Sequence, residues 1–257
     1  MQPLSRREFV GLAAVGAGAL VTGCKLDTNA PHQFTHAEAT IKARPGVPTQ
    51  APTVGYTALG LSTQRDGFLY VPTTYQAGVP APLLVLLHGA NSSAAFWENS
   101  GVGALVDDLG IVIVAPESRY ATWDFLALGG YGADPAFFDI ALDYTFRRCN
   151  INPARIAVAG FADGGVEAIG VGLANGDLFT HVMAYSPGVL FAPWLRGKPK
   201  LFVSHGNVDG ILSFDYTKSV IVPRLIDAQY SVDFVEFSGS HEIPSSVARQ
   251  SFQWFLA

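Results

Sequence analysis

The sequence predicts a single α/β domain on a mostly parallel, doubly wound sheet, with an antiparallel hairpin at its start and helices on both faces. The chain has 257 residues, 49% hydrophobic and 14% charged, which suits one well-packed domain and excludes a largely disordered chain. Apolar runs of strand length alternate with segments of helical periodicity. Glycine and polar residues follow several of these runs, where parallel sheets carry their functional sites.

The first 24 residues are typical of an export signal. The pair Arg6 and Arg7 precedes a Gly/Ala-rich apolar run at 9–20, which is too short to span a bilayer. The letters VTGC at 21–24 resemble a bacterial lipoprotein cleavage box, in which Cys24 becomes the lipidated first residue. An ordinary exported leader with a chance cysteine is the alternative. We expect an exported, periplasmic or cell-surface protein that touches the membrane only through a lipid anchor at Cys24.

The next segment, residues 25–54, is rich in proline, threonine and alanine with little periodicity, which predicts a flexible tether before a domain at 55–257. The net charge is −5. No basic stripe is visible, which argues against nucleic-acid binding. The two cysteines, Cys24 and Cys149, cannot form a disulfide framework.

The strands and helices follow from periodicity and turn residues. Runs at 55–61 and 67–71, separated by polar residues, predict the hairpin. Continuous apolar runs favour strands that are buried on both faces of a parallel sheet. Such strands are expected at 83–87, 111–115, 155–159, 181–184, 200–204 and 231–237. Helices are expected at 93–109, 134–148, from about 163 to Asn175-Gly176, 214–230 and 244–256. For the second of these, Asp134 is the expected N-cap and Pro135 the first helical residue.

Short, glycine-containing turns follow four of the expected strands. They read HGANSS at 88–93, GFADGG at 160–165, HGNVD at 205–209 and SGSHE at 238–242. A small turn such as the first allows backbone N–H groups to point into a cleft. These turns are therefore the candidate site.

An elbow, then an acid, then a histidine, each after a strand, resembles the α/β-hydrolase superfamily. The stretches HGANSSAAFW, APESRYATWD and GLANGDLFTHVMAYSPG resemble a bacterial esterase-like group that includes phospholipase/carboxylesterase and polyhydroxyalkanoate depolymerase-like members. The resemblance covers residues 55–257 and implies the α/β-hydrolase fold with carboxylic ester chemistry. It implies His241 as general base and Asp209 as the acid that orients it. The implied oxyanion hole uses backbone N–H groups of Asp163 and of Ala90 or Asn91.

The family elbow reads G-x-S-x-G, and here the serine position holds Ala162. Gly160 and Gly164 match the two glycines. A methyl group cannot form an acyl-enzyme. If Asp163 were the nucleophile, Phe161 would stand where the tight turn needs a small residue. We therefore expect esterase activity that is weak, altered or absent, and a non-catalytic ligand-binding lipoprotein is the alternative.

Three explanations of Ala162 remain open. The serine was lost naturally, or it was replaced deliberately to trap a complex, or the chain uses a different chemistry. In the third case His241 activates water and Asp163 or Glu167 assists. Glu167 lies four residues after Asp163 on the same predicted helix face. Its other interpretation is an ordinary solvated helix position.

Other polar and aromatic residues have structural interpretations beside functional ones. His88 is expected to brace the oxyanion turn, and Ser92 and Ser93 either cap a helix or contact substrate. Trp97 and Trp123 either line an apolar acyl pocket or pack in the core. Residues 190–200 are too short for a large lid, so we expect an open cleft. No cofactor or metal is expected; the expected ligand is a small or polymeric ester, and the expected state is a monomer.

Overall fold

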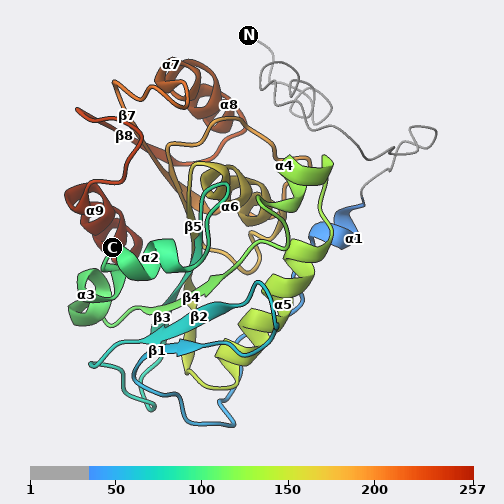
Figure 1. The fold of residues 1–257 in the computed structure, drawn as a ribbon, viewed down its shortest axis with the longest axis vertical. Helices are drawn as coiled ribbons and strands as arrows, with labels where there is room; N and C mark the ends of the chain where they lie inside the picture. The colour runs from blue at the N-terminus through green and yellow to red at the C-terminus, as the bar shows by residue number, and fades with distance from the viewer. Residues whose placement is uncertain (1–34) are drawn as a thin grey trace.

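The computed structural model describes residues 35–257, which fold around one eight-stranded sheet (Figure 1). The strand order is β1-β2-β4-β3-β5-β6-β7-β8. The strands are β1 (Gly55–Ala58), β2 (Gly67–Val71), β3 (Ala81–Leu87), β4 (Val112–Pro116), β5 (Ile151–Phe161), β6 (His181–Tyr185), β7 (Lys200–Gly206) and β8 (Val232–Phe237). The predicted hairpin is confirmed, since β1 pairs antiparallel with β2 and β2 antiparallel with β4. All other neighbouring strands run parallel.

Helices cover both faces of the sheet. The described helices are α1 (His36–Ala39), α2 (Ala95–Asn99), α3 (Val102–Val106), α4 (Asp124–Leu128), α5 (Ala133–Phe146), α6 (Asp163–Ala174), α7 (Phe214–Tyr216), α8 (Val222–Asp227) and α9 (Ser245–Leu256). One core layer packs alternate strand residues against α5, α6 and α8. A second layer packs the intervening residues against α2, α3 and α9. Burial of both faces explains why the central strands are continuously apolar.

Two predicted helices are divided in the structure. The expected helix at 93–109 is split into α2 and α3 by Gly101, which has φ 72°, and ends in a 3₁₀ turn at Asp107–Leu109. The left-handed conformation of Gly101 cannot continue an α-helix. The expected helix at 214–230 is α7, then a π-helical turn at Thr217–Ile221, then α8.

Neither side-chain cap predicted from the sequence is present. The N-cap of α5 is Gly132 rather than Asp134; the Asp134 carboxylate instead accepts hydrogen bonds from the N–H groups of Arg119 and Asp124, both at 2.6 Å. At α2, the N–H of Ala94 donates to the Glu117 carboxylate at 3.1 Å. The N-cap residue is Ala94 itself, and neither Ser92 nor Ser93 caps the helix with its side chain. At α2 the Glu117 carboxylate takes the role expected of a local serine, and at α5 the Asp124 carboxylate accepts the Asp134 N–H at 2.7 Å.

Residues 35–54, the described part of the predicted tether, pack on the domain. Ala39 and Ile41 are fully buried. The side-chain amide of Asn175, just past α6, accepts from the Ile41 N–H and donates to the Ala39 carbonyl, both at 2.8 Å. This part therefore differs from the flexible tether expected for 25–54, because two apolar side chains and one buried amide fix it. The predicted leader at 1–24 and residues 25–34 lie outside the described residues.

None of the helices within residues 35–257 combines the length and apolar character that a bilayer crossing requires.

Candidate active site

The turn between β5 and α6 has the geometry of a nucleophile elbow. Ala162 stands at its tip with φ 53° and ψ −115°, a region that non-glycine residues rarely adopt and that costs about 1–3 kcal/mol. Its N–H donates to the Tyr185 carbonyl of β6 at 2.9 Å. Ala162 therefore stands between the end of β5 and the start of α6, the place of the nucleophile in a strand–elbow–helix turn.

The two elbow glycines are required by close backbone contacts. A Cβ on Gly160 would lie 2.0 Å from the carbonyl oxygen of Gly164, and a Cβ on Gly164 would lie 2.3 Å from that of Leu87. Neither position can hold a larger residue unless the backbone moves. The G-x-A-x-G spacing is thus a steric requirement of the turn, and the residue at its centre is an alanine with no reactive group.

The turn after β3 approaches the elbow from the neighbouring strand. A Cβ on Gly89 would lie 3.7 Å from the Cβ of Ala162. Of the two alternative oxyanion-hole N–H groups on this turn, Ala90 and Asn91, that of Asn91 donates to the Ala121 carbonyl at 2.7 Å. Ala90 is therefore the better candidate on this turn. The N–H of Asp163 opens α6, where the first turn has no intrahelical acceptors for its donors.

His88 holds this turn in place through contacts of its ring. It is completely buried, and burial lowers its pKa to about 4, so the ring is neutral. Its Nδ1 contacts the Gly89 carbonyl at 2.7 Å, and its Nε2 accepts the Ser118 N–H at 3.1 Å. Arg65, which the sequence did not single out, also reaches this turn; its guanidinium donates to the Ser92 carbonyl at 2.7 Å. The expected bracing role of His88 agrees with these contacts.

The acid and the histidine expected from the resemblance are brought together. His241 Nδ1 lies 2.7 Å from Asp209 Oδ2, with the two side chains 17% and 0% exposed. A carboxylate only accepts, so Nδ1 carries a proton toward Asp209, and Nε2 is the ring nitrogen left to act as a base. The His241 ring packs against that of Phe161, next to the elbow tip, with 4.6 Å between centroids.

The Asp209 carboxylate is satisfied on both oxygens. Oδ1 accepts the N–H groups of Ile211 and Leu212 at 2.8 and 2.9 Å. Oδ2 faces two imidazoles, His241 and His205, the latter through Nε2 at 3.1 Å. Burial favours the neutral acid, but the donors Leu212, His241 and Ile211 outweigh it and lower the pKa of Asp209. A fully buried carboxylate is thereby kept ionised.

His205 has a larger part in the site than the sequence suggested. Burial lowers the pKa of His205. The hydrogen bond with Leu212 and the charge of Asp209 act in the opposite direction but do not outweigh it. Both acceptors on its Nε2, the Leu212 carbonyl at 3.2 Å and Asp209, require a proton on that nitrogen. Its position four residues before Asp209, in HGNVD, was the available signal, but i,i+4 spacing outside a helix does not by itself predict contact.

The two acids considered as auxiliary groups lie in different surroundings. Asp163 accepts a hydrogen bond from the Thr122 hydroxyl at 2.6 Å. Glu167 is 1% exposed, so the solvated-position interpretation is wrong. Neither of its carboxyl oxygens has a hydrogen-bond partner. Burial, with the nearby charges of Asp134 and Asp124, raises its pKa well above the ordinary value, so Glu167 is a neutral acid.

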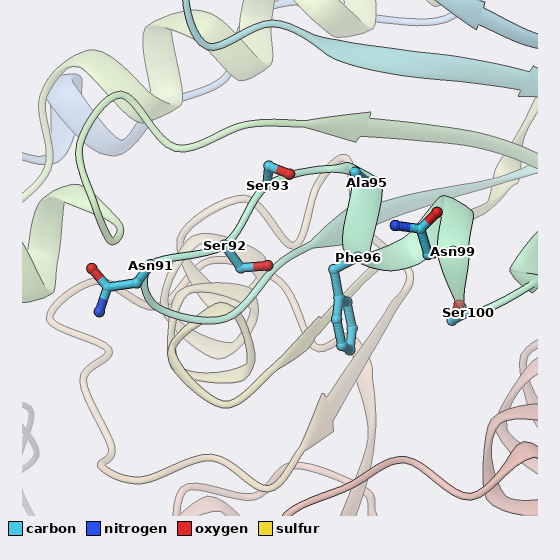
Figure 2. A pocket seen from close by; sticks show the side chains of 7 residues that line it. All are labelled: Asn91, Ser92, Ser93, Ala95, Phe96, Asn99 and Ser100. Atoms are coloured by element: carbon cyan, nitrogen blue, oxygen red, sulfur yellow. The ribbon is translucent and has the colours of Figure 1, made fainter.

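A surface groove of about 660 Å³ runs from the oxyanion turn along α2. Its lining residues are Asn91, Ser92, Ser93, Ala95, Phe96, Asn99 and Ser100. Figure 2 shows the Phe96 ring projecting from the start of α2, with the Asn91 side chain turned away from it. Phe96 stacks on Phe161, the residue before the elbow tip, with 5.5 Å between centroids. Within residues 35–257, no three or more His, Cys, Asp or Glu side chains gather as a metal site.

Solved structures share this fold. S-formylglutathione hydrolase (FrmB) from Staphylococcus aureus aligns with a TM-score of 0.64 and 15% identity over 80% of this chain and 100% of its own. Esterase PE8 aligns with a TM-score of 0.59 and 18% identity over 79% of this chain and 99% of its own. The CE1 ferulic acid esterase of Anaeromyces mucronatus, solved in complex with ferulic acid, aligns with a TM-score of 0.56 and 18% identity over 86% of this chain and 96% of its own. The chain therefore has the α/β-hydrolase fold, of the type found in carboxylic ester hydrolases.

The sequence comparisons add no closer relative. No protein-family model matches the chain, and no curated protein matches it.

Proposed function

We propose that this chain is an exported α/β-hydrolase-fold protein of the carboxylic ester type whose site binds an ester or acyl ligand and, without the elbow serine, turns it over weakly or not at all. The observation that carries the proposal is the complete frame around Ala162. The elbow glycines are constrained by backbone contacts, and Asp209 and His241 are hydrogen-bonded at 2.7 Å. A site with this frame and no hydroxyl lacks only the group that forms the covalent intermediate.

The N–H groups of Ala90 and Asp163 are the proposed oxyanion-hole donors. Such donors and substrate binding alone can retain roughly 10³–10⁴-fold catalysis over water when a triad member is removed. Glu167 is not proposed as an assisting base, because it is buried and neutral. Export and the lipid anchor at Cys24 remain part of the proposal on the strength of the sequence alone: Arg6, Arg7, the apolar run and the VTGC letters at 21–24.

The test is esterase activity after Ala162→Ser. Because the base and its acid are in place, we expect kcat/KM for p-nitrophenyl acetate to rise by about 10³-fold or more over the unmodified chain. The matched control is the double variant Ala162→Ser/His241→Ala, which has the hydroxyl and lacks the base. It should lose nearly all of the gain.

Two results would contradict the proposal. Ordinary esterase rates in the unmodified chain would mean that catalysis does not need a nucleophile at 162. A folded Ala162→Ser variant with no gain would mean that the site is not a hydrolase frame, and it would favour the non-catalytic binding lipoprotein.

A further inference from the structure

Three consecutive residues after β4, at 121–123, contact both halves of the proposed oxyanion hole. The Ala121 carbonyl accepts the N–H of Asn91 at 2.7 Å. The Trp123 indole donates to the carbonyl of His88 at 2.8 Å. These two contacts lie on either side of the proposed donor on the turn after β3, so the segment 121–123 holds that turn at both of its ends.

The middle residue of this segment is bonded to the elbow. The Thr122 hydroxyl donates to Oδ2 of Asp163 at 2.6 Å. Asp163 directly follows the elbow tip, and its N–H is the other proposed donor. Thr122 is half-buried and its neighbour Trp123 is completely buried, so the segment is fixed in the fold. One short stretch of chain therefore connects the oxyanion turn to the elbow.

Both of these turns need such support. Each holds a non-glycine residue at positive φ, Asn91 at 51° and Ala162 at 53°. Such a conformation persists only where the surrounding structure fixes it. At Asn91, the hydrogen bond to the Ala121 carbonyl is one contact that does so. The spacing of the two turns thus depends on contacts that the segment 121–123 supplies.

We propose that residues 121–123 fix the distance between the two proposed oxyanion donors, and that Thr122 is the positioning residue in this link. This rests on the proposed function in one respect, that the N–H groups of Ala90 and Asp163 are the donors. Thr122 acts through Asp163 and not by contact with the substrate. Donors held at a fixed spacing stabilise the charge that develops in the transition state. Loosening them should therefore lower kcat and leave KM unchanged.

Kinetics in the Ala162→Ser background test this role. Thr122→Val removes the hydroxyl and keeps the shape of the side chain. It should lower kcat for p-nitrophenyl acetate by about 10-fold with KM unchanged, the effect of one hydrogen bond to a carboxylate. Thr122→Ser keeps the hydroxyl and should retain most of the activity, and Thr122→Ala should behave as the valine does if valine is not accommodated.

The matched control is Thr180→Val. Thr180 is also half-buried, and its hydroxyl donates to the Ile156 carbonyl at 3.0 Å. It directly precedes β6, at the edge of the sheet opposite the elbow. The same chemical change there should leave kcat and KM unchanged.

Amide hydrogen exchange, followed by NMR on the chain with Ala162 in place, tests the link without any catalysis. The readout is the exchange rate of the Asn91 N–H, which the Ala121 carbonyl protects. Because Thr122 adjoins Ala121, Thr122→Val should let this bond open more often and raise the rate by about 10-fold. The Ala162 N–H, which is bonded to the Tyr185 carbonyl at 2.9 Å, is the internal control and should exchange at an unchanged rate.

Unchanged exchange at Asn91 in Thr122→Val overturns the proposal, and so does an unchanged kcat where the Ala162→Ser chain is active. Equal losses of kcat in Thr122→Val and Thr122→Ser, or in Thr122→Val and Thr180→Val, overturn it as well, since the hydroxyl of Thr122 would then not be the cause. An inactive Ala162→Ser chain with faster exchange at Asn91 supports the link and contradicts the proposed function. An active chain with unchanged exchange supports the proposed function and contradicts the link.

Discussion

Two buried carboxyl groups near the elbow show how the fold decides whether an acid is charged. The Asp209 side chain is 0% exposed, and Glu167 is 1% exposed. Asp209 receives two backbone N–H groups and two imidazoles, whereas neither oxygen of Glu167 has a partner. The pKa of Asp209 is lowered and that of Glu167 raised. Burial raises the pKa of Glu167, which has no donor to oppose it, whereas at Asp209 the donors outweigh burial.

The surroundings of Glu167 strengthen this contrast. Asp124 and Asp134 are both buried, and each accepts the backbone N–H of the other, at 2.7 and 2.6 Å. Burial and then the charge of Asp124 raise the pKa of Asp134 to about 7. This group of acids lies beside α6 and holds the segment between β4 and α5 in place. The pKa values of all three acids are raised, whereas the pKa of Asp209 is lowered, so Asp209 supplies the fixed negative charge beside His241.

The largest expected effect comes from removing that negative charge. In the Ala162→Ser background, Asp209→Asn should lower kcat for p-nitrophenyl acetate by about 10⁴-fold, because an amide neither fixes the His241 tautomer nor stabilises its protonated form. The measurement is steady-state kinetics at neutral pH.

Asp134→Asn is the matched control for this loss. It makes the same chemical change at a carboxyl that lies outside the triad and is already partly protonated near pH 7. It should leave kcat within a few-fold. If the two substitutions reduce kcat equally, then Asp209 acts only by stabilising the fold and is not a member of a catalytic triad.

The second effect is on stability and depends on pH. Because the pKa of Glu167 is raised in the folded state, the folded chain holds this proton at pH values where the unfolded chain has lost it. Stability from this group is therefore full below the ordinary glutamate pKa of about 4 and falls as pH rises toward the raised value. Glu167→Gln removes the titrating group. Between pH 5 and 8 it should therefore reduce the fall in the free energy of unfolding with pH by up to about 1.4 kcal/mol per pH unit.

Urea unfolding at several pH values measures this change. Asp209→Asn gives the contrasting curve, since a lowered pKa contributes stability above the ordinary aspartate pKa and loses it as pH falls further. The two variants should therefore diverge at opposite ends of the pH range. A Glu167→Gln curve parallel to that of the unmodified chain would mean that Glu167 is ionised in the folded state.

The sequence predicted the sheet and the elbow well because their signals are local. Continuous apolar runs mark strands buried on both faces, and the spacing of Gly160, Ala162 and Gly164 is a steric requirement of the turn itself. The pairing of His241 with Asp209 was implied by the resemblance to α/β-hydrolases, and both residues follow strands that end at the same edge of the sheet. The burial of Glu167 could not be predicted from the sequence, since a single charged residue on a helix is usually solvated. Glu167 is buried because Tyr131 and Asp134 pack around α6.

Contacts between residues distant in sequence account for the other differences. The sequence offers Ser92 and Ser93 as possible caps of α2 and Asp134 as the cap of α5, but Glu117 accepts the Ala94 N–H at α2 and Gly132 is the N-cap of α5. Residues 35–54 were assigned to a tether because composition does not reveal that Asn175 holds both Ala39 and Ile41. In each case the deciding group lies on another element, where periodicity and spacing along the chain carry no signal.

The smallest expected effect concerns the second imidazole on Asp209. His205 supplies one of the four donors to that carboxylate, so its loss should weaken the charge and position of Asp209 without abolishing them. In the Ala162→Ser background, His205→Leu should lower kcat about 10-fold with little change in KM, as expected for one hydrogen bond to a charged group. His205→Gln, which can still donate to Asp209, should recover most of this loss. Thermal unfolding of both variants separates this from a general structural role: if Gln and Leu are equally stable and equally slow, the hydrogen bond from His205 does not support the triad.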